Sequence, residues 1–198
     1  KGAVDQIAAQ IDAHPVVLAT TTQAAFKPDR NNVSHTGIGQ TQLGTFNLKG
    51  QQCTFLVDVL EHALPTVSWN PEIKTALWTK LAINCAINPL TALNNIDNGK
   101  INQPKYMGII AALLEEVVAV ATAEKIQLTL DELTQTVINV AQATATNSSS
   151  MRCDIQAKRQ TEIDYINGYI ARLGAKHGIA TPENTKLWQQ IKSLESNN

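Results

Sequence analysis

The chain has 198 residues, with 16 Lys and Arg against 17 Asp and Glu, a formal net charge of -1 and 43% hydrophobic residues. A chain of this length can bury a substantial core and suits one domain or one and a half. A near-neutral charge offers no basic field for phosphates, so the composition argues against a nucleic-acid-binding protein and against a membrane-surface module. Charged residues make up 17% of the chain, below the usual ~25%, which favours closely packed helices over disorder.

The cysteines and histidines indicate no metal or disulfide framework. Cys53, Cys85 and Cys153 form no C-x-x-C pair, and the four histidines are scattered singly. A reducing cytoplasm is therefore the expected compartment. The longest strongly apolar run, 107–114, ends at two glutamates, short of the ~20 residues that a membrane span needs. Since the chain also opens without a basic and apolar leader, we expect a cytoplasmic protein with no membrane partner.

The first seventy residues predict short elements separated by turns. Alternating apolar patterns and turn residues predict strands, and apolar residues at helical spacing predict helices. In chain order we expect a helix at 4–13, strands at 16–22, 33–39 and 42–47, a helix at 53–64 and a strand at 66–69. This pattern is typical of the last part of an α/β domain.

Beyond Asn70 the predicted structure is almost wholly helical. Pro71 suits the first turn of a helix, which Pro89 is expected to end near Asn88. Further helices are expected at 104–125, at 130–144, at 149–177 and from 182 onward. Because the helix at 149–177 would have nearly thirty residues, we expect it to be the central one, packed on several sides.

Lys80, Asn84 and Asn88 form the first group of residues that suggests chemistry. They are four residues apart, so they share one face of the helix predicted before Pro89. An ammonium group and two carboxamides on a mostly apolar helix can bind an oxyanion or a carbonyl oxygen. The alternative is an ordinary solvent-exposed face, although such faces carry Glu and Lys more often than Asn. Spacing alone leaves both interpretations open.

Ser150, Asp154, Lys158 and Glu162 form a second group, also spaced by four, at the start of the helix predicted at 149–177. The simplest interpretation is an N-cap serine followed by a Lys158–Glu162 ion pair on the surface. Spacing alone favours this interpretation over a binding site.

Three segments resemble motifs of the ketopantoate reductase family, in the order and at about the spacing of that family. They are LWTKLAINCAINPLTA at 77–92, the stretch from SSM at 149 to TEIDYING at 168, and GIATPENT at 178–185. The resemblance covers essentially the whole chain. It implies an NADPH-dependent reductase that converts the 2-oxo acid ketopantoate to pantoate, on the route to pantothenate and coenzyme A.

The resemblance also implies an α+β fold followed by an all-α domain. Residues 1–70 would be the C-terminal remnant of a Rossmann-type NADPH domain. Residues 71–198 would be an all-helical substrate domain, a bundle like the C-terminal domain of 6-phosphogluconate dehydrogenase. In that family the substrate lies in the cleft between two such domains.

The resemblance assigns Lys80 as the catalytic lysine, which donates a proton to the ketone oxygen while the nicotinamide delivers hydride. A fixed cation stabilises the alkoxide that forms, and partial burial would lower the lysine pKa and ease proton donation. Glu116 falls where the family often has an acid, with no role assigned. The other implied site residues are Asn84, Asn88, Asn98 and Ser150 for the substrate, and Glu162 and Ala25 for the cofactor.

The chain contains no G-x-G-x-x-G dinucleotide fingerprint, since Gly37, Gly39 and Gly44 lack that spacing and precede no predicted helix. We therefore expect this polypeptide alone to bind NADPH poorly and to be inactive, so that the activity belongs to a parent protein. Two alternatives remain open. One is a reductase of another 2-oxo acid, and the other is a non-catalytic helical module that forms a homodimer through apolar faces.

Overall fold

The computed structural model describes residues 10–11, 13–27 and 29–196. Within these ranges the chain forms two compact units, one that ends at Leu77 and one that begins at Trp78. Most of the helix predicted at 4–13 lies outside the described residues.

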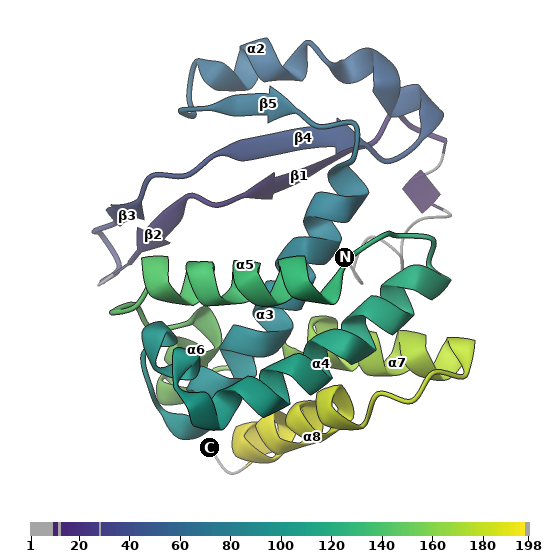
Figure 1. Ribbon diagram of the computed structural model, residues 1–198. Helices are drawn as coiled ribbons and strands as arrows, with labels where there is room; N and C mark the ends of the chain where they lie inside the picture. The colour runs from purple at the N-terminus through teal and green to yellow at the C-terminus, as the bar shows by residue number, and fades with distance from the viewer. Residues whose placement is uncertain (1–9, 12, 28, 197–198) are drawn as a thin grey trace. The chain divides into compact units, whose positions relative to one another are not determined.

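The first unit contains a three-stranded sheet with the order β1-β4-β5 (Figure 1). Strand β1 (Val17–Thr21) is antiparallel to β4 (Thr41–Thr45), and β4 is parallel to β5 (Val67–Trp69). A separate antiparallel hairpin joins β2 (Ala24–Phe26) to β3 (Ser34–Gly37). The four predicted strands are confirmed, whereas β2 escaped prediction because alanine has a low strand propensity.

The helix predicted at 53–64 is shorter in the structure. A 3-10 helix, η1 (Leu48–Cys53), comes first, and its start is set by the Asn47 side chain, which accepts a hydrogen bond from the Gly50 amide. The α-helix α2 (Leu56–Glu61) follows and lies beside β5 (Figure 1). Glycine at position 44 lets β4 pass close to residues 70–73, since a Cβ there would lie 2.4 Å from the carbonyl oxygen of Asn70 and 2.4 Å from the Cβ of Ile73.

Helix α3 (Ile73–Asn94) continues through Pro89, so the prediction that it ends at Asn88 is wrong. Pro89 has no N–H to donate to the carbonyl of Cys85, which would ordinarily interrupt the helix. In the structure the Asn167 side chain donates to that carbonyl at 3.1 Å. Because a distant amide replaces the missing donor and the surrounding turns are buried, the helix survives its proline.

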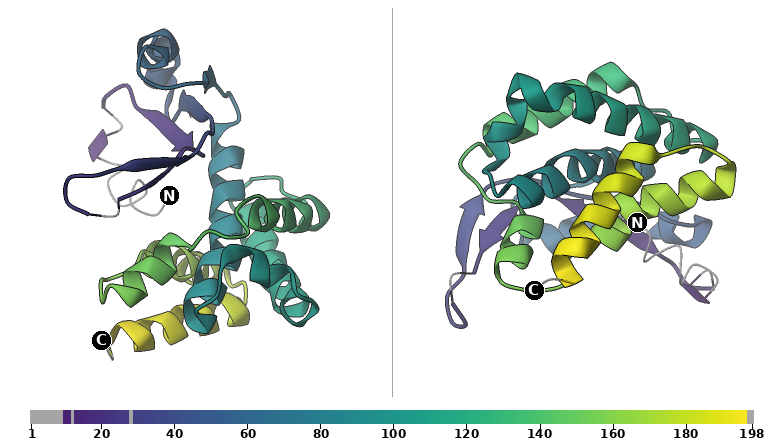
Figure 2. Two further views of the ribbon diagram at one scale, coloured as in Figure 1. Left: turned by 90° about the vertical axis from the view of Figure 1, so that its left-hand side faces the viewer. Right: turned by 90° about the horizontal axis from the view of Figure 1, so that it is seen from below.

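Six further elements follow η2 (Asn98–Asn102) in the helical unit. They are α4 (Pro104–Ala123), α5 (Leu130–Ala143), α6 (Ser150–Gln156), η3 (Ile163–Tyr165), α7 (Asn167–His177) and α8 (Pro182–Ser196). The helices predicted at 104–125, at 130–144 and from 182 are confirmed. Figure 2 shows α8 lying against α7, and α4 packs against α5, α7 and α8.

The single central helix predicted at 149–177 is wrong. Helix α6 stops at Gln156, and Lys158 has a φ of 56°, a left-handed conformation that ends a helix. The chain becomes regular again at η3 and α7. Helix α4 contacts α5, α7 and α8. Periodicity missed the break because helical spacing of apolar residues continues across it.

Helix α4 also bears on the question of a membrane. By length and composition it is the one helix among the described residues that could cross a bilayer. The core helix of a water-soluble protein passes the same test. Ile110, Leu113, Leu114 and Val117 of α4 are fully buried in the unit, so α4 is best described as a core helix.

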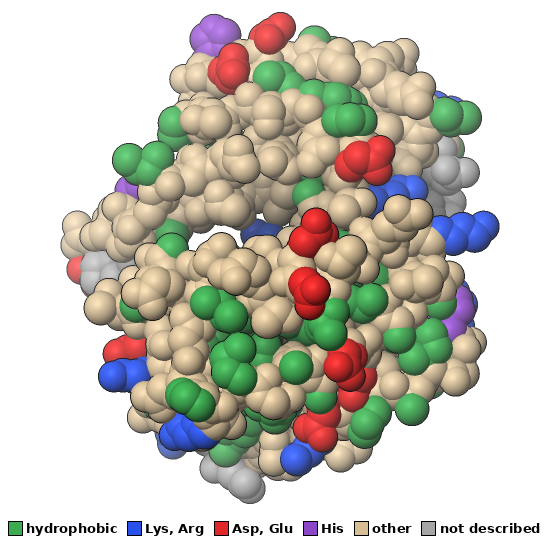
Figure 3. Space-filling model, in the orientation of Figure 1, with side chains coloured by type: hydrophobic (Ala, Val, Ile, Leu, Met, Phe, Trp, Pro, Cys, Tyr) green, Lys and Arg blue, Asp and Glu red, His purple; other side chains and the backbone are tan. Residues whose placement is uncertain are grey.

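The surface of the helical unit in Figure 3 carries an irregular line of acidic side chains, with apolar side chains between them. This face therefore presents negative charge, within a chain whose net charge is -1.

Candidate active site

Lys80, Asn84 and Asn88 lie on successive turns along one face of α3. Their exposure falls along the helix: Lys80 is exposed, Asn84 is half-buried and Asn88 is only 8% exposed. The row thus runs from the surface into the helical unit. An ordinary solvent-exposed face, the alternative that spacing allowed, does not account for its buried end.

A pocket of about 340 Å³ lies at this buried end. Its lining comes from α3, α6 and the segment that leads into α7, and it consists of Asn88, Ser150, Met151, Asp154, Gln160, Glu162 and Ile166. Met151 and Ile166 are buried and supply apolar surface, while amide, hydroxyl and carboxylate groups supply the polar part. A pocket of this size and mixture suits a small polar molecule.

The structure therefore brings together three of the predicted site residues, Asn88, Ser150 and Glu162, although they are separated by up to 74 positions in the sequence. Asn84 lies one helical turn before Asn88 and does not line the pocket. Ala25 is an exposed residue of β2, in the other compact unit.

Glu162 acts electrostatically on Lys80. Burial lowers the pKa of the Lys80 ammonium below its ordinary value of 10.5, and the negative charge of Glu162 opposes this by raising the pKa. Desolvation favours the neutral form of a lysine, whereas a nearby carboxylate favours the charged form. A lysine with a pKa shifted in this way is a candidate for proton transfer.

Ser149, and not Ser150, is the N-cap of α6. The Ser149 hydroxyl accepts a hydrogen bond from the amide of Arg152 at 3.1 Å and another from the hydroxyl of Thr91 at 2.7 Å. The interpretation of Ser150 as a capping serine is therefore wrong. Because its neighbour performs the capping, the hydroxyl of Ser150 is available at the pocket.

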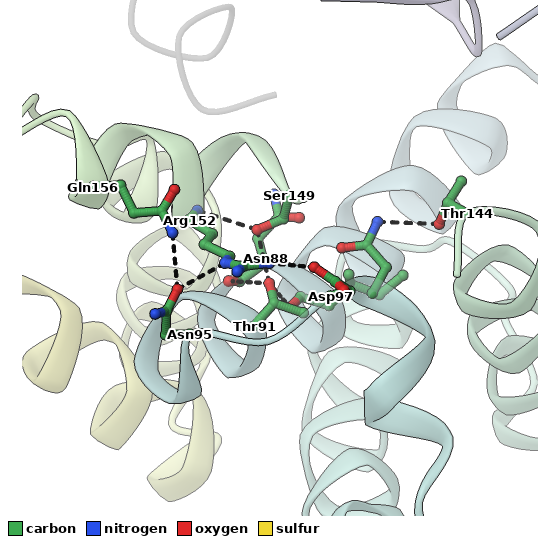
Figure 4. Close-up of polar contacts among 10 residues, drawn as sticks. Asn88, Thr91, Asn95, Asp97, Thr144, Ser149, Arg152 and Gln156 are labelled. Carbon is green, nitrogen blue, oxygen red and sulfur yellow. Dashed lines mark hydrogen bonds and ion pairs between the residues drawn. The ribbon is translucent and has the colours of Figure 1, made fainter. Parts of the chain in front are cut away.

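Arg152 ties α6 to the end of α3 (Figure 4). Its Nη1 lies 2.5 Å from an oxygen of Asp97, and its Nε donates to the side-chain oxygen of Asn95 at 2.8 Å. Gln156 donates to the same oxygen of Asn95 at 2.8 Å. These contacts hold the two helices that supply Asn88 and Ser150, and no spacing in the sequence pointed to them.

Asn98 lies in η2, apart from the residues that line the pocket. Its side-chain nitrogen donates to the hydroxyl of Thr144 at 3.1 Å, and its backbone amide donates to the carbonyl of Asn147 at 3.0 Å. Its side-chain oxygen is buried and has no hydrogen-bond partner among the described residues. A buried acceptor of this kind is costly, so it invites a donor from a ligand or from water.

Glu116 has a structural position. Its carboxylate accepts hydrogen bonds from the backbone amides of Glu183 and Asn184 at 2.8 and 2.9 Å, and from the Asn184 side chain at 2.7 Å. These are first-turn amides of α8, which otherwise lack partners within the helix. Glu116 therefore caps α8 from the middle of α4.

Two polar pocket residues, Asp154 and Gln160, were assigned no role from the sequence. Asp154 shares the four-residue spacing of Ser150, and its Oδ1 accepts two hydrogen bonds from Arg159, at 3.0 and 2.8 Å. Gln160 lies in the irregular segment after α6, where a continuous helix was predicted. That break also separates Lys158 from Glu162, so the ion pair predicted along one helix face is wrong.

A protein-family profile described as "Ketopantoate reductase PanE/ApbA C terminal" matches residues 72–195. The chain belongs to the ketopantoate reductase family. All residues that line the pocket fall within the matched range.

Relatives in this family are named 2-dehydropantoate 2-reductase. The protein from Vibrio cholerae serotype O1 is 54% identical over 98% of this chain, and that from Escherichia coli O157:H7 is 42% identical over 92%. The chain spans 66% and 59% of their respective lengths. The chain thus spans less than two thirds of the length of these relatives.

Two solved structures are similar in fold. D-mandelate dehydrogenase, in a ternary structure with NADH and anilino(oxo)acetate, has a TM-score of 0.93 and 25% identity, covering 100% of this chain and 65% of that chain. A PanE/ApbA family ketopantoate reductase from Ralstonia eutropha JMP134 has a TM-score of 0.80 and 27% identity, covering 91% of this chain and 59% of that chain.

Proposed function

We propose that the full-length protein reduces the 2-oxo acid ketopantoate to pantoate with NADPH, a step toward pantothenate and coenzyme A. The observation that carries the proposal is the position of Lys80, whose pKa is lowered by burial and influenced by Glu162, on the helix that leads to a polar pocket. Family membership supports the same activity. A cytoplasmic location and a homodimer remain predictions from the sequence.

Lys80 is the proposed proton donor. Hydride addition at the ketone carbon leaves negative charge on the ketone oxygen, and an ammonium group within hydrogen-bond reach stabilises that charge and then protonates it. Partial burial of the ammonium group lowers the Lys80 pKa, so the proton leaves more easily than from a fully solvated lysine. Glu162 keeps the ammonium charged before hydride arrives.

The amide and hydroxyl groups are the proposed substrate contacts. Asn84, Asn88 and Ser150 can donate to the carboxylate and carbonyl oxygens of a 2-oxo acid. The family resemblance adds Asn98, which does not line the pocket and whose buried side-chain oxygen has no partner among the described residues. Neutral donors orient an anionic substrate without holding it as tightly as a bidentate arginine would.

A dinucleotide would supply the hydride. The Glu162 carboxylate is exposed at the pocket, and acceptor oxygens of this kind suit the hydroxyl or carboxamide donors of a nicotinamide nucleoside. The similar D-mandelate dehydrogenase structure contains NADH. We propose Glu162 and the backbone at Ala25 as contacts to NADPH, and the sheet unit as the last part of a Rossmann-type domain.

The test is a steady-state assay of the full-length protein with ketopantoate and either NADPH or NADH. Lys80→Ala should lower kcat by about 10²- to 10⁴-fold, the usual contribution of a positioned general acid. Lys74→Ala, which removes an exposed lysine from the same helix, is the matched control and should leave kcat unchanged. Unchanged turnover in Lys80→Ala would refute the assignment.

A second candidate function is the reduction of a different 2-oxo acid. The similarity to D-mandelate dehydrogenase is the observation that favours this candidate. The 2-oxo acid that corresponds to mandelate is the competing substrate. A higher kcat/KM for this aromatic acid than for ketopantoate would favour the second candidate, because pocket side chains set such preferences.

A further inference from the structure

The segment that carries Glu162 is tied to α8 immediately before Glu162. Both the backbone amide and the hydroxyl of Thr161 donate to the same oxygen, Oε1 of Glu195, each at 2.7 Å. The Glu195 side chain is only 10% exposed and Thr161 is 7% exposed. Two short hydrogen bonds to one poorly solvated carboxylate form a strong anchor.

A second tie follows Glu162. Trp188 donates its indole N–H to one oxygen of Asp164 at 2.6 Å, and Lys192 lies 3.1 Å from the other. Lys192 also lies 2.8 Å from the remaining oxygen of Glu195. The two ties are therefore joined into one network on α8, with Glu162 between them.

The packing of α7 on α8 supports this network. A Cβ at Gly168 would lie 2.8 Å from the Trp188 ring, so only glycine lets the indole lie this close to α7. Arg172 lies over the same ring at 5.5 Å and donates to the backbone carbonyl of Asp164 at 2.7 Å. The indole is thus held in the orientation in which its N–H meets Asp164.

The segment needs such ties because it has little regular structure of its own. Residues 157–162 lie between the end of α6 and the start of η3, and Lys158 adopts a left-handed conformation. The backbone amides of residues 157–159 still donate to carbonyls of α6, so the segment depends on other contacts mainly at residues 160–162. Contacts from α8, which contributes no residue to the pocket lining, set the path of the chain around Glu162.

We infer that α8 positions Glu162 for the dinucleotide, with Glu195 as the principal positioning residue and Asp164 as the second. The inference rests on the cofactor role proposed for Glu162. It predicts that dinucleotide affinity depends on a helix that does not line the pocket, because displacement of a contact by a fraction of an ångström weakens it.

The experiment uses the full-length protein with Glu195→Ala, Glu195→Gln and, as a matched control on the exposed side of α8, Gln190→Ala. Glu195→Ala should raise the KM for NADPH about ten-fold with a smaller change in kcat. Glu195→Gln keeps an acceptor oxygen for Thr161 and should recover most of the affinity, while Gln190→Ala should match the unaltered protein.

A double-variant comparison separates positioning from general loss of structure. In a Glu162→Gln background, Glu195→Ala should add little to the KM for NADPH, because its effect passes through Glu162. Hydrogen exchange gives a second readout. The amide of Thr161 should exchange faster in Glu195→Ala and remain protected in Glu195→Gln.

Two results would overturn the inference: faster exchange at Thr161 with unchanged NADPH affinity, or an equal effect of Glu195→Ala with and without Glu162. If Glu195→Ala does not fold, Thr161→Val replaces it. This variant keeps the amide contact to Glu195 and removes the hydroxyl, which donates to Glu195 and accepts from the Ile163 amide. It should raise the KM for NADPH by a smaller factor, and an unchanged KM would overturn the inference. If ketopantoate is not reduced, the proposed function fails, whereas exchange and calorimetric NADPH binding still decide the role of α8.

Discussion

Replacing Asn167 should destabilise the helical unit, because this fully buried amide supplies two donors that nothing else replaces. Its nitrogen donates to the carbonyl of Cys85 at 3.1 Å and to the side-chain oxygen of Asn184 at 2.9 Å. The Cys85 carbonyl cannot use its usual partner four residues later, since that residue is Pro89. Asn167→Ala therefore leaves two buried acceptors without donors.

The expected magnitude follows from the number of acceptors. Each unsatisfied buried acceptor costs about 1–3 kcal/mol, which gives about 2–6 kcal/mol for the pair. The side-chain oxygen of Asn167 is itself buried without a partner among the described residues, and its removal offsets part of the loss. We therefore expect a decrease of about 3 kcal/mol in the free energy of unfolding, or roughly 6–12 °C in Tm.

The assay is urea-induced unfolding followed by circular dichroism, with the slope m checked for each variant. Pro89→Ala supplies the control, because it restores an N–H that can donate to the carbonyl of Cys85. In the Asn167→Ala background it should recover about 1 kcal/mol. In the unaltered protein, where the carbonyl already has a donor, it should bring no such gain. Asn139→Ala, on the exposed side of α5, should stay within about 0.5 kcal/mol.

The reasoning fails if Asn167→Ala costs less than about 1 kcal/mol. It also fails if Pro89→Ala changes stability equally in both backgrounds, since no energetic coupling would then exist between the proline and the amide.

Four further predictions concern charge and capping. Burial lowers the pKa of Lys80 and Glu162 raises it, so Glu162→Gln should move the alkaline limb of kcat/KM to lower pH. Glu116→Ala removes the cap of α8 and should lower the free energy of unfolding by about 1–2 kcal/mol in thermal or urea unfolding. Although burial raises the pKa of Asp164, hydrogen bonds from two α8 side chains bring it below 3.8. The stability that Asp164 contributes is thus complete above pH 3.8 and lost as the pH falls through the lower folded pKa, and Asp164→Asn should remove this loss in acid unfolding. Burial raises the pKa of the Cys85 thiol, so this thiol should react with a thiol reagent only after unfolding.

Each of these has a contradicting outcome. An alkaline limb that moves to higher pH in Glu162→Gln would mean that the carboxylate does not stabilise the Lys80 ammonium. Unaltered stability of Glu116→Ala would show that water replaces the carboxylate at the start of α8. If Asp164→Asn lost more stability in acid than the unaltered protein, Asp164 would not have a lowered pKa in the folded state. Rapid labelling of Cys85 in the native protein would contradict the burial of its thiol.

Local pattern was sufficient for the helices whose ends are marked in the sequence. Pro104 and Pro182 each begin a helix at the position where proline costs no hydrogen bond. The four predicted strands likewise follow from short apolar runs between turn residues. The row of Lys80, Asn84 and Asn88 needed only helical spacing, since all three lie on one continuous helix.

The pocket could not be predicted from spacing, because its residues come from segments that meet only in the folded unit. Ser150 and Glu162 share a four-residue repeat, yet they reach the pocket from opposite ends of a break in the helix. A continuous helix would have carried Glu162 three turns away from Ser150, at about 1.5 Å per residue. Glu195, whose carboxylate anchors Thr161 within that segment, is 34 positions away in the sequence.

The sequence by itself determined where most helices and strands form, the family and the row of polar residues on α3, because periodicity, proline positions and contiguous motifs are local properties. Only the tertiary structure decided that α3 passes through Pro89 and that the helix predicted at 149–177 is broken. At Pro89, the carbonyl of Cys85 accepts a hydrogen bond from the side chain of Asn167, 82 positions away. In the break, the amide of Thr161 donates to the side chain of Glu195, 34 positions away. Satisfaction of buried polar groups depends on which segments pack together, so local periodicity cannot reveal it.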